Sequence, residues 1–273
     1  MPEGPEIRRI ADQLERAVVG CTADRVWFEQ KHLKPYASEL TGRRVVSIRP
    51  RGKALLTRFE EDLFLYSHNQ LYGRWYTVQP ERLPRTNRTL RVAIETPRRW
   101  ALLYSASDIE VLHEGELSEH PFLAKLGPDL LDEQTTPKKI RERLAEPRFR
   151  GRALGSLLLD QGFVAGIGNY LRSEILFFTG LRPNARAKDL ASEQLADLSR
   201  VMRKVIQRSY QTGGLTEVAS EVRKAKAAGE KRRHYRHAVF ARGGLPCRRC
   251  GAKIQRSMVA SRQFYLCPNC QPG

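Results

Sequence analysis

The first stretch of the chain carries apolar residues at helical spacing. Pro5 suits the first turn of a helix, and Gly20 is a typical stop signal. The apolar positions between them are three or four residues apart, which places them on one face. They are Ile7, Ile10, Ala11, Leu14 and Val18. The pattern therefore predicts a leading helix that buries one side.

From about Val26 to Ser105 the helical period gives way to short runs rich in β-branched, aromatic and apolar residues. These runs cover residues 26–28, 45–46, 55–56, 63–66, 91–94 and 102–104. Runs of this length separated by turn residues are typical of strands. We expect a β-sandwich or barrel behind the leading helix.

Beyond Gly127 the pattern becomes helical again. Thr136 followed by Pro137 predicts a capped helix start. Three further helices are expected, over residues 154–160, 170–178 and 192–211. The chain is thus predicted to be an α+β protein of two domains, with a helical second domain that ends in a small cysteine-bearing module.

Charge narrows the choice of partners. The 273 residues include 48 Lys and Arg against 30 Asp and Glu, a net charge of +18. Such an excess attracts polyanions and disfavours self-association, so nucleic acid is the first candidate partner, a membrane surface the second, and a monomer is expected. The sequence has no run of ~18 apolar residues and no secretory signal, which predicts a protein of the cytoplasm without a membrane span.

Seven of these cations lie between Arg223 and Arg236, a stretch with one glutamate and almost no large apolar side chain. We expect this stretch to be a mobile basic loop without a packed core.

Four of the five cysteines form two Cys-x-x-Cys pairs separated by sixteen residues. They are Cys247, Cys250, Cys267 and Cys270, while Cys21 stands alone near the other end. Four thiolates in two such turns fit one tetrahedral zinc ion. Because four cysteines leave no open coordination position, the zinc is expected to be structural.

The segment between the two cysteine pairs carries Arg256 and Arg262 among strand-forming residues. A rigid hairpin with guanidinium groups suits contact with phosphates, although a solvated turn explains these residues equally well.

Gly166, Gly168 and Asn169 form a glycine-rich turn at the start of a predicted helix. Such a turn lets backbone N–H groups approach a phosphate. Asn169 can equally serve as the cap of that helix, and the two roles are compatible.

The N-terminus offers a nucleophile. Removal of Met1 would leave Pro2 with a secondary amine at the head of the leading helix. An α-amino group has a pKa near ~8, so a useful fraction is unprotonated at cellular pH. Glu3 beside it could act as a general acid, or it could simply complement the helix dipole.

Several separated motifs favour the catalytic interpretation. The opening Met-Pro-Glu-Gly-Pro-Glu-Ile resembles the formamidopyrimidine-DNA glycosylase and endonuclease VIII family, with Gly4 and Ile7 similar to the endonuclease VIII branch. The similarity continues nearly end to end. It includes residues 51–57, 65–73, 103–110, 120–123, 158–161 and 168–172 and the cysteine module.

The resemblance implies a bifunctional base-excision-repair enzyme, a DNA glycosylase and abasic-site lyase that removes oxidised pyrimidines from damaged duplex DNA. It implies that Pro2 forms a Schiff base, that Glu3 donates a proton, and that Lys53 assists β-elimination. Arg262 would bind phosphate and assist δ-elimination. Iminium chemistry of this kind needs no redox or organic cofactor, so one structural Zn²⁺ is the only cofactor expected.

The same resemblance assigns DNA-binding roles. Gln70, Leu71 and Tyr72 match the loop that fills the gap left by an everted base, and Asn169 matches a phosphate ligand of a helix–two-turn–helix element. Lys125 stands where an arginine is expected, which keeps the charge but loses the bidentate fork.

The implied domains are a catalytic β-sandwich at 1–125, a hinge at 126–134, a helix–two-turn–helix domain with the basic loop at 135–236, and a zinc finger with a β-hairpin at 237–271. Two alternative functions stay open. One is a zinc-ribbon DNA-binding protein without catalysis, and the other is a glycosylase of the sister branch that acts on oxidised purines.

Overall fold

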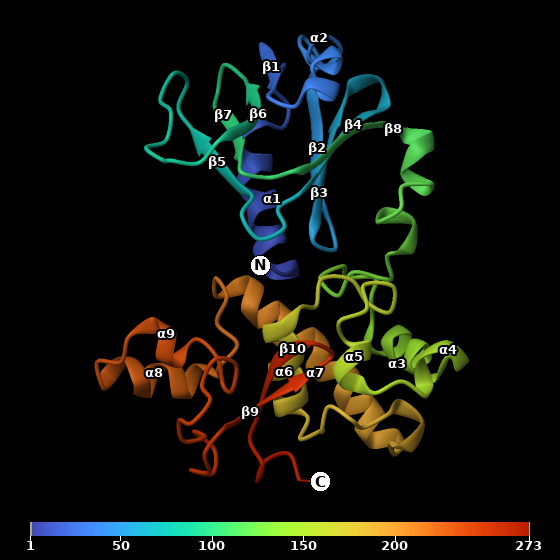
Figure 1. Ribbon diagram of the computed structural model, residues 1–273, viewed down its shortest axis with the longest axis vertical. Helices are drawn as coiled ribbons and strands as arrows, with labels where there is room; N and C mark the ends of the chain where they lie inside the picture. Colours follow the sequence, from blue (N-terminus) through green and yellow to red (C-terminus); the bar gives the residue numbers. More distant parts are fainter. Residues whose placement is uncertain (1, 273) are drawn as a thin grey trace. The chain divides into compact units, whose positions relative to one another are not determined.

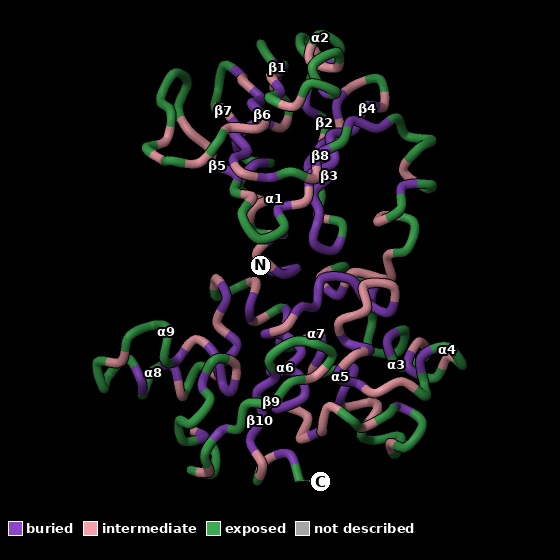
Figure 2. Tube along the Cα trace, viewed as in Figure 1, coloured by how far each residue is buried: buried purple, intermediate pink, exposed green. Residues whose placement is uncertain are grey.

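The computed structural model describes residues 2–272, and the chain divides into two compact units between Lys125 and Leu126 (Figure 1). Each unit has its own buried core, which Figure 2 shows as purple segments inside green and pink ones. The described residues contain no helix with both the length and the apolar character that a membrane crossing requires.

Unit 1 is a β-sandwich with a leading helix, as predicted. Helix α1 (Gly4–Val18) precedes two four-stranded antiparallel sheets. The first sheet has the order β1 (Arg25–Phe28), β6 (Leu90–Glu95), β7 (Trp100–Tyr104) and β5 (Arg74–Val78). The second has the order β2 (Val45–Arg51), β3 (Ala54–Phe59), β4 (Leu63–His68) and β8 (Asp108–His113). Short helix α2 (Pro35–Leu40) follows β1.

The core of unit 1 forms where the buried stripe of α1 meets the sheets. Ile7, Ala11 and Leu14 are each 1 % exposed and pack with apolar residues of both sheets. Helix α1 contacts β2, β3, β5 and β7. Burial of this stripe holds the N-terminal end of the chain in a defined place.

The sequence pattern missed β5 and β8, which both lie at sheet edges. Only Trp75 of β5 is fully buried, so the apolar signal was weak. In β8 the alternating burial of Ile109 and Val111 corresponds to a period-two strand signal in the sequence.

Unit 2 is helical and ends in a β-hairpin. Its main helices are α3 (Pro137–Ala145), α6 (Asn169–Phe178) and α7 (Ser192–Gln211), with short helices α4 (Pro147–Arg150) and α5 (Leu154–Leu157) between α3 and α6. Thr136 caps α3 as predicted, since its hydroxyl accepts a hydrogen bond from the Lys139 N–H at 3.3 Å. Phe264 and Leu266 of the hairpin, β9 (Gln255–Val259) and β10 (Arg262–Leu266), pack into the helical core.

The expectation of an unstructured core-free stretch at 223–236 is wrong. The segment contributes to helix α8 (Ala219–Ala227) and forms helix α9 (Arg232–Tyr235). Three small or aromatic side chains, Val222, Ala225 and Tyr235, form a buried cluster of their own. The few apolar residues of this stretch lie at helical spacing, which is enough to bury them together.

Candidate functional site

The N-terminal end of α1 presents Pro2 and Glu3. Glu3 is only 5 % exposed, although carboxylates are seldom buried. The Glu3 N–H donates to a carboxylate oxygen of Glu6 at 3.1 Å, and the Glu3 carbonyl accepts from the Ile7 N–H at 3.1 Å. These two bonds hold Pro2 just before the first turn of the helix, near its positive end. Met1, whose removal would free the Pro2 amine, lies outside the described residues.

Lys53 lies in the tight turn between β2 and β3. Gly52 before it has a φ of +61°, a backbone conformation that glycine adopts without strain. The Lys53 side chain is 8 % exposed, so it is not the solvated surface lysine that its position between strands suggests. Burial lowers the pKa of the nearby His68; the negative charge of Asp108 opposes this shift, and the positive charge of Lys53 adds to it.

Residues 69–73 form the loop between β4 and β5, and this loop exposes two large apolar side chains. Leu71 is 63 % and Tyr72 is 69 % exposed. The Gly73 N–H donates to the Asn69 carbonyl at 2.7 Å, and a Cβ at Gly73 would lie 2.6 Å from that oxygen. Only glycine therefore permits this closure.

Gln70 anchors the same loop. Its N–H donates to His68 Nδ1 at 3.1 Å, and its side-chain oxygen accepts from the Ser107 hydroxyl at 3.0 Å. Because His68 Nδ1 acts as the acceptor, the lowered pKa of His68 favours the neutral ring that this bond requires. These two hydrogen bonds hold the loop at Gln70, while Leu71 and Tyr72 at its tip are exposed.

Strand register brings Lys53 and this loop together. Ala54, which follows Lys53, pairs with His68, which precedes the loop. The β2–β3 turn and the β4–β5 loop therefore leave the sheet at the same end, and Figure 1 shows the start of α1 at that end of unit 1. Lys125 is exposed and lies at the end of a 3-10 turn, Leu123–Lys125, as the last residue of unit 1.

In unit 2, α6 and the hairpin are joined through Asn169. Its side-chain amide N–H donates to the Gln263 carbonyl at 2.8 Å, and its oxygen accepts from Arg172 at 2.6 Å. The cap of α6 is Gly168, so the interpretation of Asn169 as the capping side chain is wrong. The structure instead places Asn169 against the residue that follows Arg262.

Arg172 is a neighbour of the candidate site that sequence reasoning did not single out. It is fully buried, and its guanidinium donates to the carbonyls of Gly155 at 2.8 Å and Val259 at 3.1 Å. It thereby holds the hairpin on β9 while Asn169 holds it on β10. An arginine within an otherwise apolar helix face, one turn after Asn169, was the available signal.

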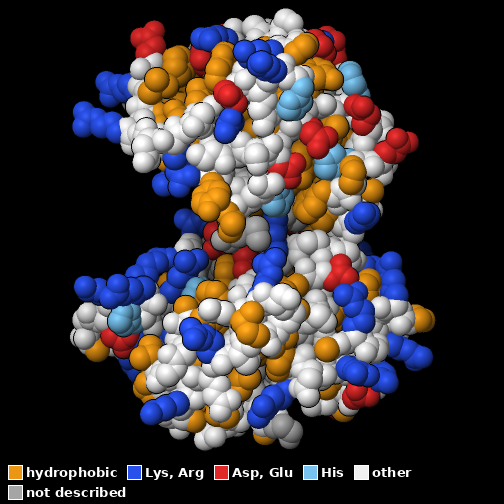
Figure 3. Space-filling view, viewed as in Figure 1, with side chains coloured by type: hydrophobic (Ala, Val, Ile, Leu, Met, Phe, Trp, Pro, Cys, Tyr) orange, Lys and Arg blue, Asp and Glu red, His pale blue; other side chains and the backbone are white. Residues whose placement is uncertain are grey.

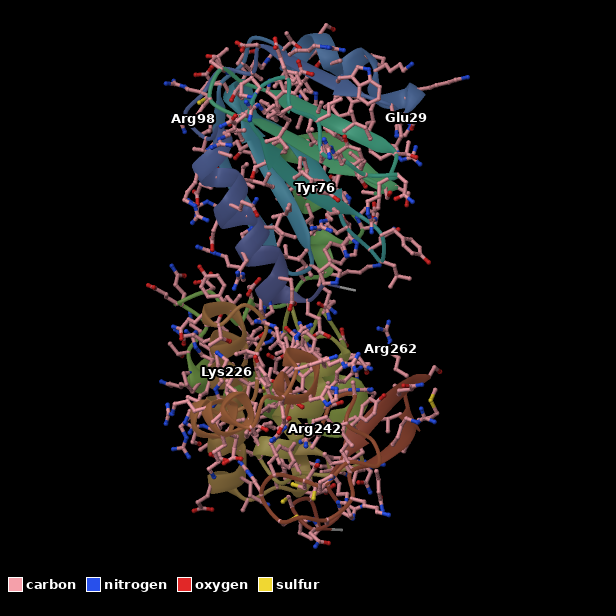
Figure 4. The ribbon with its side chains drawn as sticks, turned by 90° about the vertical axis from the view of Figure 1, so that its left-hand side faces the viewer. Glu29, Tyr76, Arg98, Lys226, Arg242 and Arg262 are labelled. Carbon is pink, nitrogen blue, oxygen red and sulfur yellow. The ribbon has the colours of Figure 1, made fainter. Side chains whose placement is uncertain are left out.

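Arg262 begins β10 directly after the hairpin turn. Val259 pairs with Arg262, so the turn consists of Ala260 and Ser261, whose φ angles are +51° and +58°. Positive φ at both central residues defines a tight hairpin turn of type I′. Arg262 is exposed, and Figure 4 shows it at this edge of unit 2.

The four cysteines of the two pairs converge. All four Sγ atoms lie within 4.8 Å of one another, with 3.9 Å between Cys247 and Cys270 and 3.4 Å between Cys250 and Cys267. Thiolates bound to one tetrahedral zinc at about 2.3 Å are separated by about 3.8 Å. The donor set and its spacing therefore fit a zinc ion.

Known protein families match nearly the whole chain. The family model for the formamidopyrimidine-DNA glycosylase N-terminal domain matches residues 1–106, and the model for the H2TH domain of formamidopyrimidine-DNA glycosylase matches residues 126–220. The model for the zinc finger found in FPG and IleRS matches residues 244–273.

The chain belongs to the formamidopyrimidine-DNA glycosylase family.

Relatives within this family include Endonuclease 8 of Escherichia coli, which is 49 % identical over 99 % of this chain and 100 % of that protein. Endonuclease 8 of Pectobacterium atrosepticum is 51 % identical over the same shares. Among solved structures, MutM in complex with DNA containing carbocyclic 8-oxo-G has the same fold, with a TM-score of 0.81 and 24 % identity over both full chains. Lactococcus lactis Fpg in complex with DNA containing N7-benzyl-Fapy-dG gives 0.81 at 25 % identity, again over both full chains.

Family membership confirms the predicted α+β architecture, with an H2TH domain and a terminal zinc finger.

Proposed function

We propose that this chain is a bacterial base-excision-repair enzyme of the endonuclease 8 branch, a DNA glycosylase and abasic-site lyase that acts on oxidised pyrimidines in duplex DNA. Full-length identity of about half to Endonuclease 8 supports the branch. The net charge of +18 suits a polyanionic substrate. We place the enzyme in the cytoplasm as a monomer.

The observation that carries the proposal is Pro2 at the head of α1 beside the buried Glu3. Glu3 is 5 % exposed and directly follows Pro2, so removal of Met1 would place a buried carboxyl group next to a free secondary amine. An enzyme that forms a covalent iminium needs both groups, one as the nucleophile and the other as the acid.

The reaction begins when the Pro2 nitrogen attacks C1′ of the damaged nucleotide. The bond from C1′ to the base breaks, and the departing base keeps the electron pair of that bond and takes up the proton that the amine loses. Glu3 then protonates the sugar ring oxygen as the C1′–O bond opens, which leaves an iminium between C1′ and Pro2. Water hydrolyses this Schiff base at the end and frees the enzyme.

The iminium withdraws electrons from C2′ and makes its proton acidic. Loss of that proton expels the 3′ phosphate by β-elimination, and a second elimination expels the 5′ phosphate. Lys53, buried in its turn, is proposed to assist the first step, and Arg262 the second. The product is a one-nucleotide gap.

DNA recognition is proposed for the remaining predicted residues. The exposed Leu71 and Tyr72, steadied by Gln70, would fill the space left by the everted base. Asn169 and Lys125 would contact phosphates. The Asn169 side chain already positions the hairpin residue next to Arg262, so phosphate binding and hairpin placement are coupled.

We propose that the four cysteines hold one structural zinc ion. Cys247 and Cys250 come from the turn before β9, and Cys267 and Cys270 from the turn after β10. The zinc when bound would fix both ends of the hairpin that carries Arg262.

Borohydride trapping tests the proposal. Protein with a processed N-terminus and a C-terminal tag is incubated with a duplex that carries thymine glycol, reduced, and digested for mass spectrometry. We expect a covalent DNA adduct on Pro2. A matched protein with a Gly-Ser extension before Pro2 has an amide in place of the amine and should bind DNA without forming an adduct.

The alternatives predict different results. Equal behaviour of the two proteins, with binding and no adduct, would support a zinc-ribbon DNA-binding protein and refute the enzyme. A higher kcat/KM for 8-oxoguanine than for thymine glycol in a lesion panel would place the enzyme in the sister branch.

A further inference from the structure

Residues 216–236 form an excursion that leaves and rejoins unit 2 at one point. The Thr216 N–H donates to the Arg236 carbonyl at 2.9 Å, and the Thr216 hydroxyl lies 2.8 Å from His237 Nδ1. The buried carboxylate of Glu174 on α6 accepts from that hydroxyl at 2.6 Å. The two ends are therefore clamped to each other and to the helix that carries Asn169.

The clamp continues beyond the excursion. Glu174 is fully buried and also accepts from three successive backbone N–H groups at 2.7 to 2.9 Å. These belong to Ala238, Val239 and Phe240. A carboxylate with this many donors is well satisfied, so the base of the excursion is rigid.

The excursion itself is folded. Val222 and Ala225 of α8 pack against Tyr235 of α9, with Leu215 beside them. The carboxylate of Glu230, between the two helices, pairs with both terminal nitrogens of Arg248 in the zinc finger, at 3.1 and 2.6 Å. We call residues 216–236 the basic module.

The exposed surface of the basic module is strongly positive. Six of its cationic residues are exposed, and Figure 3 shows Lys and Arg side chains gathered where Figure 1 places α8 and α9. They are Arg223, Lys224, Lys226, Lys231, Arg232 and Arg233.

Only one of the three glutamates of the module pairs with a cation of this surface. Glu217 and Glu230 both face Arg248, which lies outside the module, and Glu221 pairs with Lys224. Within residues 2–272, the side chains of Arg223, Lys226 and Lys231 make no hydrogen bond or ion pair. These cations are folded into place and available to an anionic partner.

The chemistry of the surface selects the partner. The large apolar side chains that the structure exposes all lie outside residues 216–236, so the module offers neither an anchor for a membrane interface nor an apolar centre for a protein interface. Fixed cations without apolar anchors suit a row of phosphates.

We infer that the basic module is a second DNA-backbone contact, which binds phosphates of the duplex outside the segment held by Asn169 and Arg262. The inference rests on the proposed function, because the duplex is the substrate there. It extends the footprint on DNA and adds affinity without sequence preference.

The test compares duplexes of two lengths that carry an uncleavable abasic-site analogue. The variant Arg223→Ala/Lys226→Ala/Lys231→Ala removes three exposed cations. We expect its Kd for a duplex of about three helical turns to rise roughly tenfold or more at ~100 mM salt. The slope of log Kd against log salt should become shallower by up to about 2.7, while binding to a duplex of about one turn changes little.

A matched control removes the same charge elsewhere on unit 2. Arg141, Lys188 and Lys204 are exposed, and their triple alanine variant should leave the length dependence intact. An equal loss of affinity for the long duplex in both triple variants would show that net charge alone causes the loss, and would overturn the inference. Unchanged binding of the module variant to the long duplex would overturn it as well.

A second variant replaces residues 218–234 with a short Gly-Ser linker, which the adjacency of Thr216 and Arg236 permits. It should reproduce the triple variant. Trapping on Pro2 separates the two proposals. If the module variants still form the adduct and keep their affinity for the long duplex, only the inference about the module is refuted. If the unmodified protein forms no adduct, the proposed function is refuted.

Discussion

The proposed catalytic end of unit 1 and the α6–hairpin junction of unit 2 are built differently. In unit 1, Lys53 and the loop at residues 69–73 lie near each other because β3 and β4 pair in a register that places both at the same end of the sheet. In unit 2, Arg172 and Asn169 grip the hairpin through hydrogen bonds to its carbonyls. Substitutions in the first region should thus change activity without changing stability. Substitutions in the second region should change function and stability together.

The largest expected effect is Glu3→Gln, which keeps the volume of the side chain and removes its acid. We expect kcat on a thymine glycol duplex to fall about 10²- to 10⁴-fold, the usual contribution of a general acid. The melting temperature should change by no more than about 3 °C. Glu15→Gln, an exposed carboxylate on the same helix, is the control and should keep full activity. A loss of activity matched by a collapse in stability would make the role of Glu3 structural.

Arg172→Met should disturb stability and DNA binding together. The change leaves the Gly155 and Val259 carbonyls without their buried donor, at a cost of about 3–5 kcal/mol in the free energy of unfolding. Urea unfolding measures the loss, and fluorescence anisotropy measures the accompanying rise in Kd. Arg172→Lys should recover part of both, and Arg186→Met, at an exposed arginine, should alter neither. A loss below about 1 kcal/mol would contradict the proposed grip.

The buried His237 should make the stability of unit 2 depend on pH. Burial, together with the positive charges of Arg236 and Arg232, lowers the pKa of His237 to about 3. Between about pH 6.5 and 3 the unfolded chain binds the proton and the folded chain does not. The free energy of unfolding should therefore fall as pH falls, by at most about 1.4 kcal/mol per pH unit from this group.

His237→Asn removes this titration and should flatten the profile of unfolding free energy against pH. Parallel profiles for the two proteins would show that His237 is protonated when folded.

The smallest effect concerns the hairpin turn. Ala260 and Ser261 both have positive φ, which costs residues with a Cβ about 1–2 kcal/mol. The double change Ala260→Asn/Ser261→Gly supplies the residues that such a turn favours and should raise the free energy of unfolding by about 1 kcal/mol. Arg262 keeps its place in β10, so lyase activity should not change. A drop in stability would show that the turn needs its present side chains.

The sequence determined the elements whose signals are local. The periodic stripe of α1, the capping of α3 by Thr136 and the span of α7 follow from residue order, because each depends on neighbours within a few positions. The cysteine spacing likewise identified the four thiols that converge. Family motifs, rather than periodicity, identified Lys53 and Leu71 as candidates for function.

Only the tertiary structure decided which distant residues depend on one another. The buried Arg172 reaches carbonyls 17 and 87 positions away, and Asn169 holds a residue 94 positions away. No window of sequence contains both partners of these bonds. The same holds for the basic module, where Glu230 pairs with Arg248 of the zinc finger and two short helices share a small core. Packing fixes these arrangements because a buried polar group must find a partner wherever the fold brings one.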